Sequence, residues 1–144
     1  MKSLTLKQAA AEINVSERML ADISRRVGTW AEYRDGIAQE INDHGADCGF
    51  SGFIYYYETV AFFRDHSDEI MVMLRDLASD VGQTPTEMVA GFNCLSGVVD
   101  RDTVAAVLKF GRANDDDRAV VQNALAWFAL ETVSALLVDY MERA

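Results

Sequence analysis

Proline, the residue that most strongly interrupts an α-helix, occurs once in this chain of 144 residues. Apolar residues recur instead at three- and four-residue intervals, which place them on one side of a helix. One such series is Trp30, Tyr33, Ile37 and Ile41. Half of the residues are hydrophobic, so a chain of this length can bury a core without disulfides or metals. The pattern predicts an all-α fold.

Capping residues divide this pattern into about seven to eight helices within a single domain, 1–144. The clearest start signal is Thr84-Pro85-Thr86-Glu87, a capping box with proline at the first helical position. We expect Asp102 to cap the next helix and Asn114 the last one, which is apolar on most sides and therefore long and buried. The expected helices span residues 7–13, 17–26, 30–43, 55–66, 67–77, 85–95, 102–110 and 115–141.

The segment 44–53 contains three glycines in ten residues. Glycine is costly inside helices and favoured where φ is positive, so the segment is predicted to be a loop. We expect Gly45, Gly49 and Gly52 to be its positive-φ residues, and their replacement by alanine to destabilise the fold.

Polar residues at the start of this loop allow two interpretations. His44 and Asp47, with Asp43 and Cys48 beside them, could form a metal or acid/base cluster, or they could hydrogen-bond the loop backbone. The second interpretation is favoured because the local spacing brings together at most two or three ligands. The other histidine of the chain, His66, is 22 residues away.

Acidic residues outnumber basic ones by 23 to 13, which gives a net charge of −10 and an isoelectric point near 4.5. This balance opposes tight wrapping of nucleic acid by the whole chain. Cys48 and Cys94 are too few for a disulfide framework or a four-cysteine zinc site and indicate a reduced, cytoplasmic protein. The longest nearly apolar run, 124–130, is too short to cross a membrane. We expect no catalytic residues, metal, cofactor or membrane association.

Residues 6–20 resemble a helix-turn-helix of the DNA-binding kind, within a subregion 1–27. Ala10 is small enough for two helices to approach each other, and Asn14 stands where the turn usually has glycine. Val15 would fill the core beneath the turn, and Ser16 would cap the recognition helix.

Three arginines of this unit are candidate DNA contacts: Arg18, Arg25 and Arg26. Residues 1–36 carry six basic and five acidic side chains, whereas the rest of the chain has a net charge of −11. Glu17 and Asp22, however, lie on the face that would meet DNA. Paired short helices are also common structural units, so the pattern predicts DNA binding only as an alternative.

Two further segments carry a resemblance to a family. The first has His-Gly-Ala-Asp at 44–47, Gly-Phe-Ser-Gly-Phe at 49–53 and consecutive tyrosines, and the second has Ala-Trp-Phe-Ala-Leu-Glu at 126–131. Together they resemble an uncharacterised family of small acidic proteins of phages and other bacterial mobile elements, over about two thirds of the chain. The resemblance implies that the chain is one of the small mobile-element proteins, which include inhibitors of host defence. Among these inhibitors are anti-CRISPR proteins, many of which bind a host protein.

Candidate partner-binding residues lie between these two segments. The acidic ones are Asp65, Asp68, Glu69 and Asp76. They can be a solvated surface, or a face that mimics phosphate and occupies the nucleic-acid channel of a partner. Three successive tyrosines cannot all face one core, so Tyr55 or Tyr56 is a candidate anchor for an interface.

We therefore expect a non-catalytic inhibitor that binds a host protein or ribonucleoprotein complex, such as a CRISPR effector, through an acidic surface. The alternative is a transcriptional regulator that reads DNA with residues 1–27 and forms a homodimer through its acidic body. An enzyme ranks third.

Overall fold

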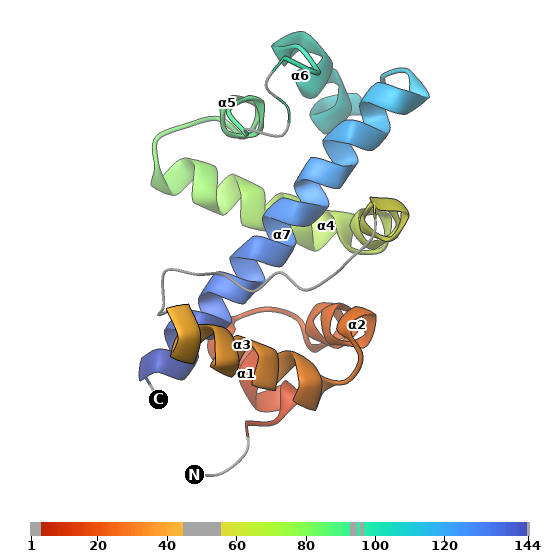
Figure 1. Cartoon of the computed structure of the whole chain (residues 1–144). Helices are drawn as coiled ribbons and strands as arrows, with labels where there is room; N and C mark the ends of the chain where they lie inside the picture. Colours follow the sequence, from red (N-terminus) through yellow and green to blue (C-terminus); the bar gives the residue numbers. More distant parts are fainter. Residues whose placement is uncertain (1–3, 45–55, 93–94, 96, 144) are drawn as a thin grey trace. The chain divides into compact units, whose positions relative to one another are not determined.

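The computed structural model describes residues 4–44, 56–92, 95 and 97–143. These residues form seven helices and contain no strand, so the predicted all-α fold is confirmed (Figure 1). The glycine-rich segment, with Gly45, Gly49 and Gly52, lies outside the described residues.

The chain forms two compact units, which are described separately. One unit combines Met1–Tyr55 with Leu130–Ala144, and the other is Tyr56–Ala129. The last helix, α7 (Asp115–Arg143), contributes its first half to the second unit and its second half to the first. The single domain expected from the sequence stays a prediction.

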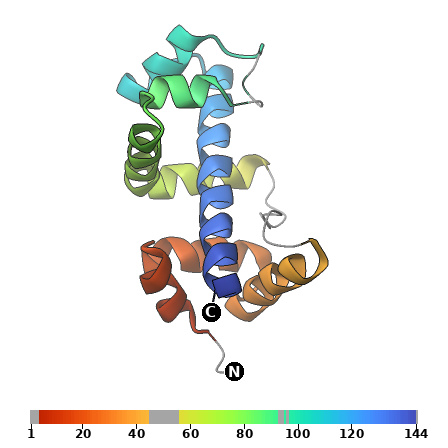
Figure 2. The ribbon, with the colours of Figure 1, turned by 90° about the vertical axis from the view of Figure 1, so that its left-hand side faces the viewer.

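The first unit begins with α1 (Leu6–Ile13), α2 (Glu17–Val27) and α3 (Trp30–His44). Each of these helices begins beside a hydroxyl residue that accepts a backbone N–H of the first turn: Thr5, Ser16 and Thr29. The indole Nε1 of Trp30 donates to the Leu4 carbonyl over 2.8 Å, which fastens the N-terminal segment to α3. Helices α1 and α2 lie side by side in Figures 1 and 2.

The second half of α7 completes the core of this unit. Its buried residues follow the spacing of one helix face: Leu130, Val133, Ser134, Leu137 and Val138. Tyr33 on α3 is 1% exposed and shares a hydrogen bond with the hydroxyl of Ser134. Burial raises the pKa of Tyr33 well above that of a free tyrosine, so this hydroxyl stays neutral.

The second unit contains α4 (Tyr56–Asp80), α5 (Pro85–Ala90), α6 (Arg101–Phe110) and the first half of α7. Helix α4 has non-helical φ and ψ at His66, where the sequence predicts the end of one helix and the start of another. The His66 ring is buried and lies 4.8 Å from the ring of Phe62, centroid to centroid. Thr59 of α4 donates a hydrogen bond to Asn123 of α7, and Phe92 stacks on Phe128.

Three details differ from the sequence prediction. Asp100, not Asp102, caps α6, because its carboxylate accepts the N–H of Thr103 over 2.7 Å and Asp102 already lies in the first turn. Helix α5 ends at Ala90, five residues earlier than expected, although the φ and ψ of Gly91 are still in the right-handed helical region. The last helix was expected to be buried, but its Leu136 is exposed because the second half of α7 buries another face.

By length and composition alone, α7 could cross a membrane, although the longest uninterrupted apolar run appeared too short for this. Half of the apolar stretch that meets the criterion is buried by other residues of the protein. A core helix of a folded domain meets the same criterion, so the finding is weak evidence for a membrane span.

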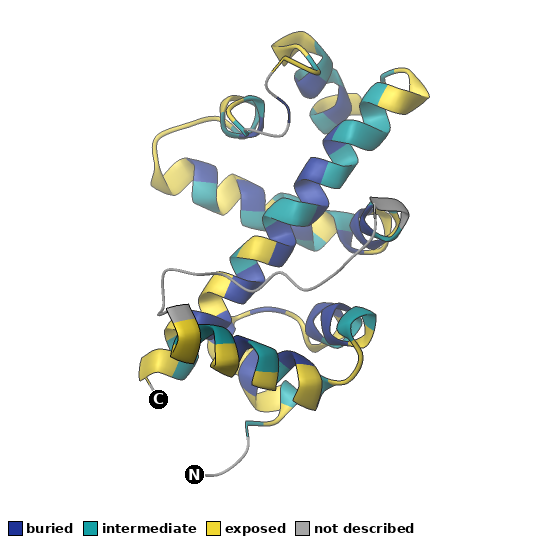
Figure 3. Ribbon diagram, in the orientation of Figure 1, coloured by how far each residue is buried: buried dark blue, intermediate teal, exposed yellow. Residues whose placement is uncertain are grey.

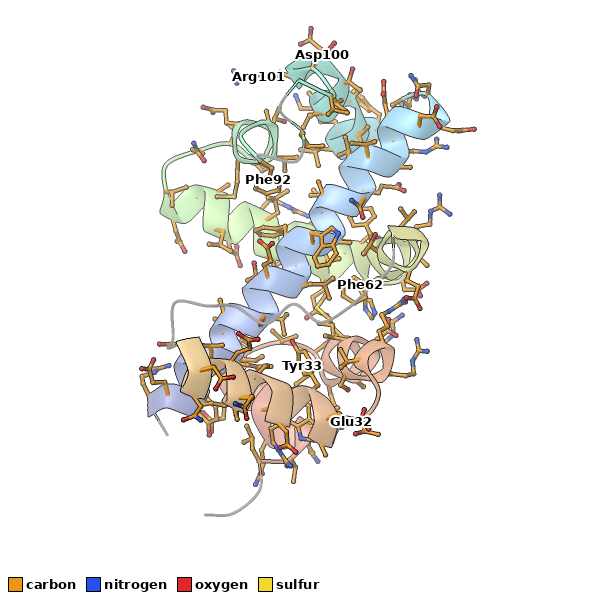
Figure 4. The ribbon with its side chains drawn as sticks, in the orientation of Figure 1. Glu32, Tyr33, Phe62, Phe92, Asp100 and Arg101 are labelled. Carbon is orange, nitrogen blue, oxygen red and sulfur yellow. The ribbon has the colours of Figure 1, made fainter. Side chains whose placement is uncertain are left out.

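Gly28, which follows α2, is a position where we expect replacement of glycine by another residue to be unfavourable. Its φ of 157° is one that residues with a Cβ rarely adopt, and the added Cβ would meet the carboxylate of Glu32 (Figure 4). We expect Gly28→Ala to lower the free energy of unfolding by about 1–2 kcal/mol, measured by urea denaturation.

The matched control is Gly91→Ala, because Gly91 has a φ of −84° and its added Cβ makes only ordinary contacts. We expect this variant to be neutral or slightly stabilised. Equal losses in the two variants would show that backbone conformation at Gly28 is not what limits the substitution.

Candidate functional site

Near the N-terminus, the first unit has two short helices, α1 and α2, which contact each other and are joined by a tight turn. Among the non-glycine residues that the structure describes, only Asn14 has a positive φ, at 57°. Its backbone N–H donates hydrogen bonds to carbonyl groups at the end of α1. Val15 is buried beneath the turn, Ala10 is 3% exposed, and the Ser16 hydroxyl accepts the N–H of Met19 over 3.0 Å. The sequence thus predicted the turn, its core residue and its cap correctly.

The three candidate arginines do not share one exposed face. Arg18 and Arg25 are exposed on α2, and seven residues of helix bring them to nearly the same side. Arg25 is bonded to Asp22, which lies between them on that side. Arg26 is turned away by a further 100°, its side chain is only 8% exposed, and it lies 3.5 Å from Asp22. Asp22 therefore offsets part of the positive charge that DNA would require.

The candidate carboxylates lie on α4 in the second unit, whose ribbon alternates between buried and exposed residues (Figure 3). Asp65, Asp68 and Asp76 are all exposed, and the eight residues from Asp68 to Asp76 bring these two to within about 80° of each other around the helix axis. The kink at His66 separates Asp65 from the other two. Glu69 is half-buried and contributes less to this surface.

An apolar residue stands among these carboxylates. Val72 is 50% exposed and lies one helical turn from both Asp68 and Asp76. We refer to Asp65, Asp68, Val72 and Asp76 as the acidic face of α4. An apolar centre with a charged rim is the usual composition of a protein–protein interface.

The tyrosine candidates are not placed by the structure. Tyr55 lies outside the described residues, and Tyr56 begins α4 with a side chain that is likewise not described. The same holds for the side chain of His44 and for Asp47 and Cys48. Within the described part of the chain, no three residues of the His, Cys, Asp and Glu types gather as they would around a metal ion.

A pocket of about 560 Å³ lies between α4, α5 and α6 of the second unit. Its apolar wall includes Met71, Pro85 and Leu108. Its charged residues are Arg75 from α4, and Arg101, Asp102 and Lys109 from α6. Three cations against one carboxylate make this the basic pocket of an otherwise acidic protein.

Thr84 and Glu87, which cap α5 beside this pocket, hydrogen-bond each other. Glu87 of α5 accepts the N–H of Thr84 over 3.2 Å, which lowers its pKa, and the charge of Arg101 contributes less to the shift. Arg75 Nε donates to the Met71 carbonyl. Among the described residues, Arg75, Arg101 and Lys109 form no ion pair, although the charge of Glu87 attracts Arg101.

The sequence pattern did not predict the basic pocket. Arg75 and Arg101 are 26 residues apart on different helices, so no local motif connects them. Only the packing of α6 beside α5, and of α5 beside α4, brings them together. The eight-residue spacing of Arg101 and Lys109, which places both on one side of a helix, was the one signal available in the sequence.

These elements define an all-α protein with two N-terminal helices joined by a tight turn, an acidic helix face and a basic pocket. Residues 12–143 match a family described as a domain of unknown function, DUF7222, and the chain belongs to this family. The match begins within α1, so it leaves out most of the first of these two helices. No curated protein and no solved structure matches the chain.

Proposed function

We propose that this protein is a non-catalytic inhibitor that binds a basic surface of a host nucleic-acid-handling complex, such as a CRISPR effector, through the acidic face of α4. The main observation is the alignment of exposed Asp68, Val72 and Asp76 on successive turns, with exposed Asp65 before the kink of the same helix. Fixed carboxylates can take the place of backbone phosphates, and Val72 supplies the apolar contact that a protein partner needs. The likeness to mobile-element proteins supports the inhibitory role.

Charge outside this face agrees with the proposal. The second unit, Tyr56–Ala129, contains 12 acidic and six basic residues, so its net charge is −6. Such a field accelerates encounter with a positively charged channel and repels free nucleic acid. We further propose that the protein acts in the cytoplasm, needs no cofactor and binds no membrane.

The test compares two variants with the same change in net charge. The first reverses the acidic face with Asp65→Lys, Asp68→Lys and Asp76→Lys. The matched control reverses three exposed acidic residues of the first unit: Glu12, Glu131 and Glu142. Each protein is used to capture partners from a bacterial lysate for mass spectrometry, followed by surface-plasmon kinetics on the partner found.

We expect the control to retain the partner and the acidic-face variant to associate about tenfold more slowly or worse at low salt. Added salt should slow association of the wild type in the same way, since screening weakens steering. Equal losses in both variants would attribute binding to net charge alone. Salt-independent association, with large losses in Tyr55→Ala or Tyr56→Ala, would instead make the aromatic segment the interface.

A second candidate function is DNA-binding regulation, favoured by the helix-turn-helix geometry at Asn14, Val15 and Ser16. The bond between Arg25 and Asp22 and the burial of Arg26 argue against it. A salt-series mobility shift on double-stranded DNA decides between the two. We expect no sequence-selective binding tighter than about 1 μM at physiological salt. Selective binding that weakens in Arg18→Ala or Arg25→Ala would make regulation the better proposal.

A further inference from the structure

We propose that the basic pocket of the second unit binds a small organic phosphate, with the phosphate groups on Arg75, Arg101 and Lys109. This proposal does not depend on the acidic face of α4, because the pocket is lined by other residues and would bind a negatively charged ligand. It rests on three observations: the volume of the pocket, the excess of positive charge in its lining, and the absence of ion pairs for that charge among the residues that the structure describes.

The volume suits a ligand of nucleotide size. Pockets for small molecules and cofactors measure about 300–1,000 Å³, and this one measures about 560 Å³. Residues of three helices form its walls, so tertiary packing builds the pocket, which is open to solvent on one side. Met71, Pro85 and Leu108 provide an apolar surface for the non-phosphate part of a ligand.

Charge defines the class of ligand. Arg101 and Lys109 lie two turns apart on one side of α6, about 12 Å along its axis, and Arg75 lies on α4. Figure 4 shows Arg101 extending from the start of α6 on the side of α5. Guanidinium groups bind phosphate oxygens in pairs of hydrogen bonds, and the ammonium group adds a third positive charge. The single carboxylate of the lining, Asp102, leaves a net positive charge of two.

None of these three cations takes part in an ion pair within the described residues. All three are exposed in a unit of net charge −6. An acidic unit has many carboxylates with which arginines can pair, as Arg118 does with Asp115 over 2.6 Å. In the described residues, the cations of the pocket have no such pair, so a polyanion can bind there without first displacing a carboxylate.

The experiment is isothermal titration of the full chain with ATP in magnesium-free buffer, with adenosine and tripolyphosphate as companion probes. We expect saturable ATP binding with a Kd of about 1 mM or lower, and no binding of adenosine. Tighter binding of ATP than of tripolyphosphate would assign an organic phosphate as ligand. Equal binding of the two would support the anion site and assign the phosphate chain itself.

The variants are Arg101→Ala and Lys109→Ala, with Arg112→Ala as the matched control. Arg112 is an exposed arginine of the same unit that does not line the pocket. We expect the pocket variants to bind ATP about tenfold more weakly or worse, and the control to bind as the wild type does. Equal loss in the control, adenosine binding as tight as that of ATP, or no binding of any phosphate at about 1 mM would overturn the proposal.

Discussion

Phe62→Ala is expected to lower the free energy of unfolding by about 3–5 kcal/mol. The ring of Phe62 is completely buried in the second unit and contacts His66 at the kink of α4 (Figure 4). Its removal loses the transfer free energy of the ring and leaves a cavity, because the packed neighbours relax only in part. Urea denaturation followed by circular dichroism measures the effect.

Phe110→Ala is the matched control for this prediction. It removes the same ring from the end of α6, where Phe110 is 71% exposed, so we expect a change within about 0.5 kcal/mol. A loss from Phe110→Ala as large as that from Phe62→Ala would mean that a partner or another copy of the chain covers Phe110 in solution. A small loss from Phe62→Ala would contradict the core described for the second unit.

Leu137→Ala is expected to cost about 2–5 kcal/mol of unfolding free energy. Leu137 is completely buried in the first unit, on the side of α7 that carries the other buried residues of that half. Leu136 is 37% exposed on a different side of the helix. We therefore expect Leu136→Ala to cost about 1 kcal/mol, and less than the change at its neighbour.

The two leucines make a sharp comparison because they are adjacent, identical and on the same helix. Intrinsic helix propensity and the effect on the unfolded chain are equal for the two substitutions, so the difference measures burial alone. Thermal and urea denaturation of the two variants decide it. A reversed order would show that the second half of α7 buries a different face in solution.

The acidic face and the basic pocket both use α4, yet their variants separate the two proposals. Asp68 and Asp76 belong to the face, whereas Arg101 and Lys109 belong to the pocket and to α6. Capture of a partner that survives Arg101→Ala, together with ATP binding that survives the reversal of the acidic face, would establish two independent sites. Loss of both activities in either variant would point to a single binding surface.

Local interactions explain what the sequence determined by itself. The capping box of Thr84 and Glu87 and the left-handed turn at Asn14 depend on residues three or four positions apart. Because these contacts are local, the sequence predicted the all-α class and the starts of most helices. The error at Asp102 arose because two aspartates two residues apart are equivalent as caps, and only the backbone of Asp100 is extended.

Tertiary packing decided the features that depend on distant residues. A helix that is apolar on most sides does not reveal which face each half buries, so Leu136 and Leu137 could not be told apart in the sequence. The sequence pattern suggested that Arg26 was an exposed cation, but the fold buries its side chain beside Asp22. The basic pocket exists only because α4, α5 and α6 meet, since burial and convergence are properties of neighbours that local spacing along the chain does not encode.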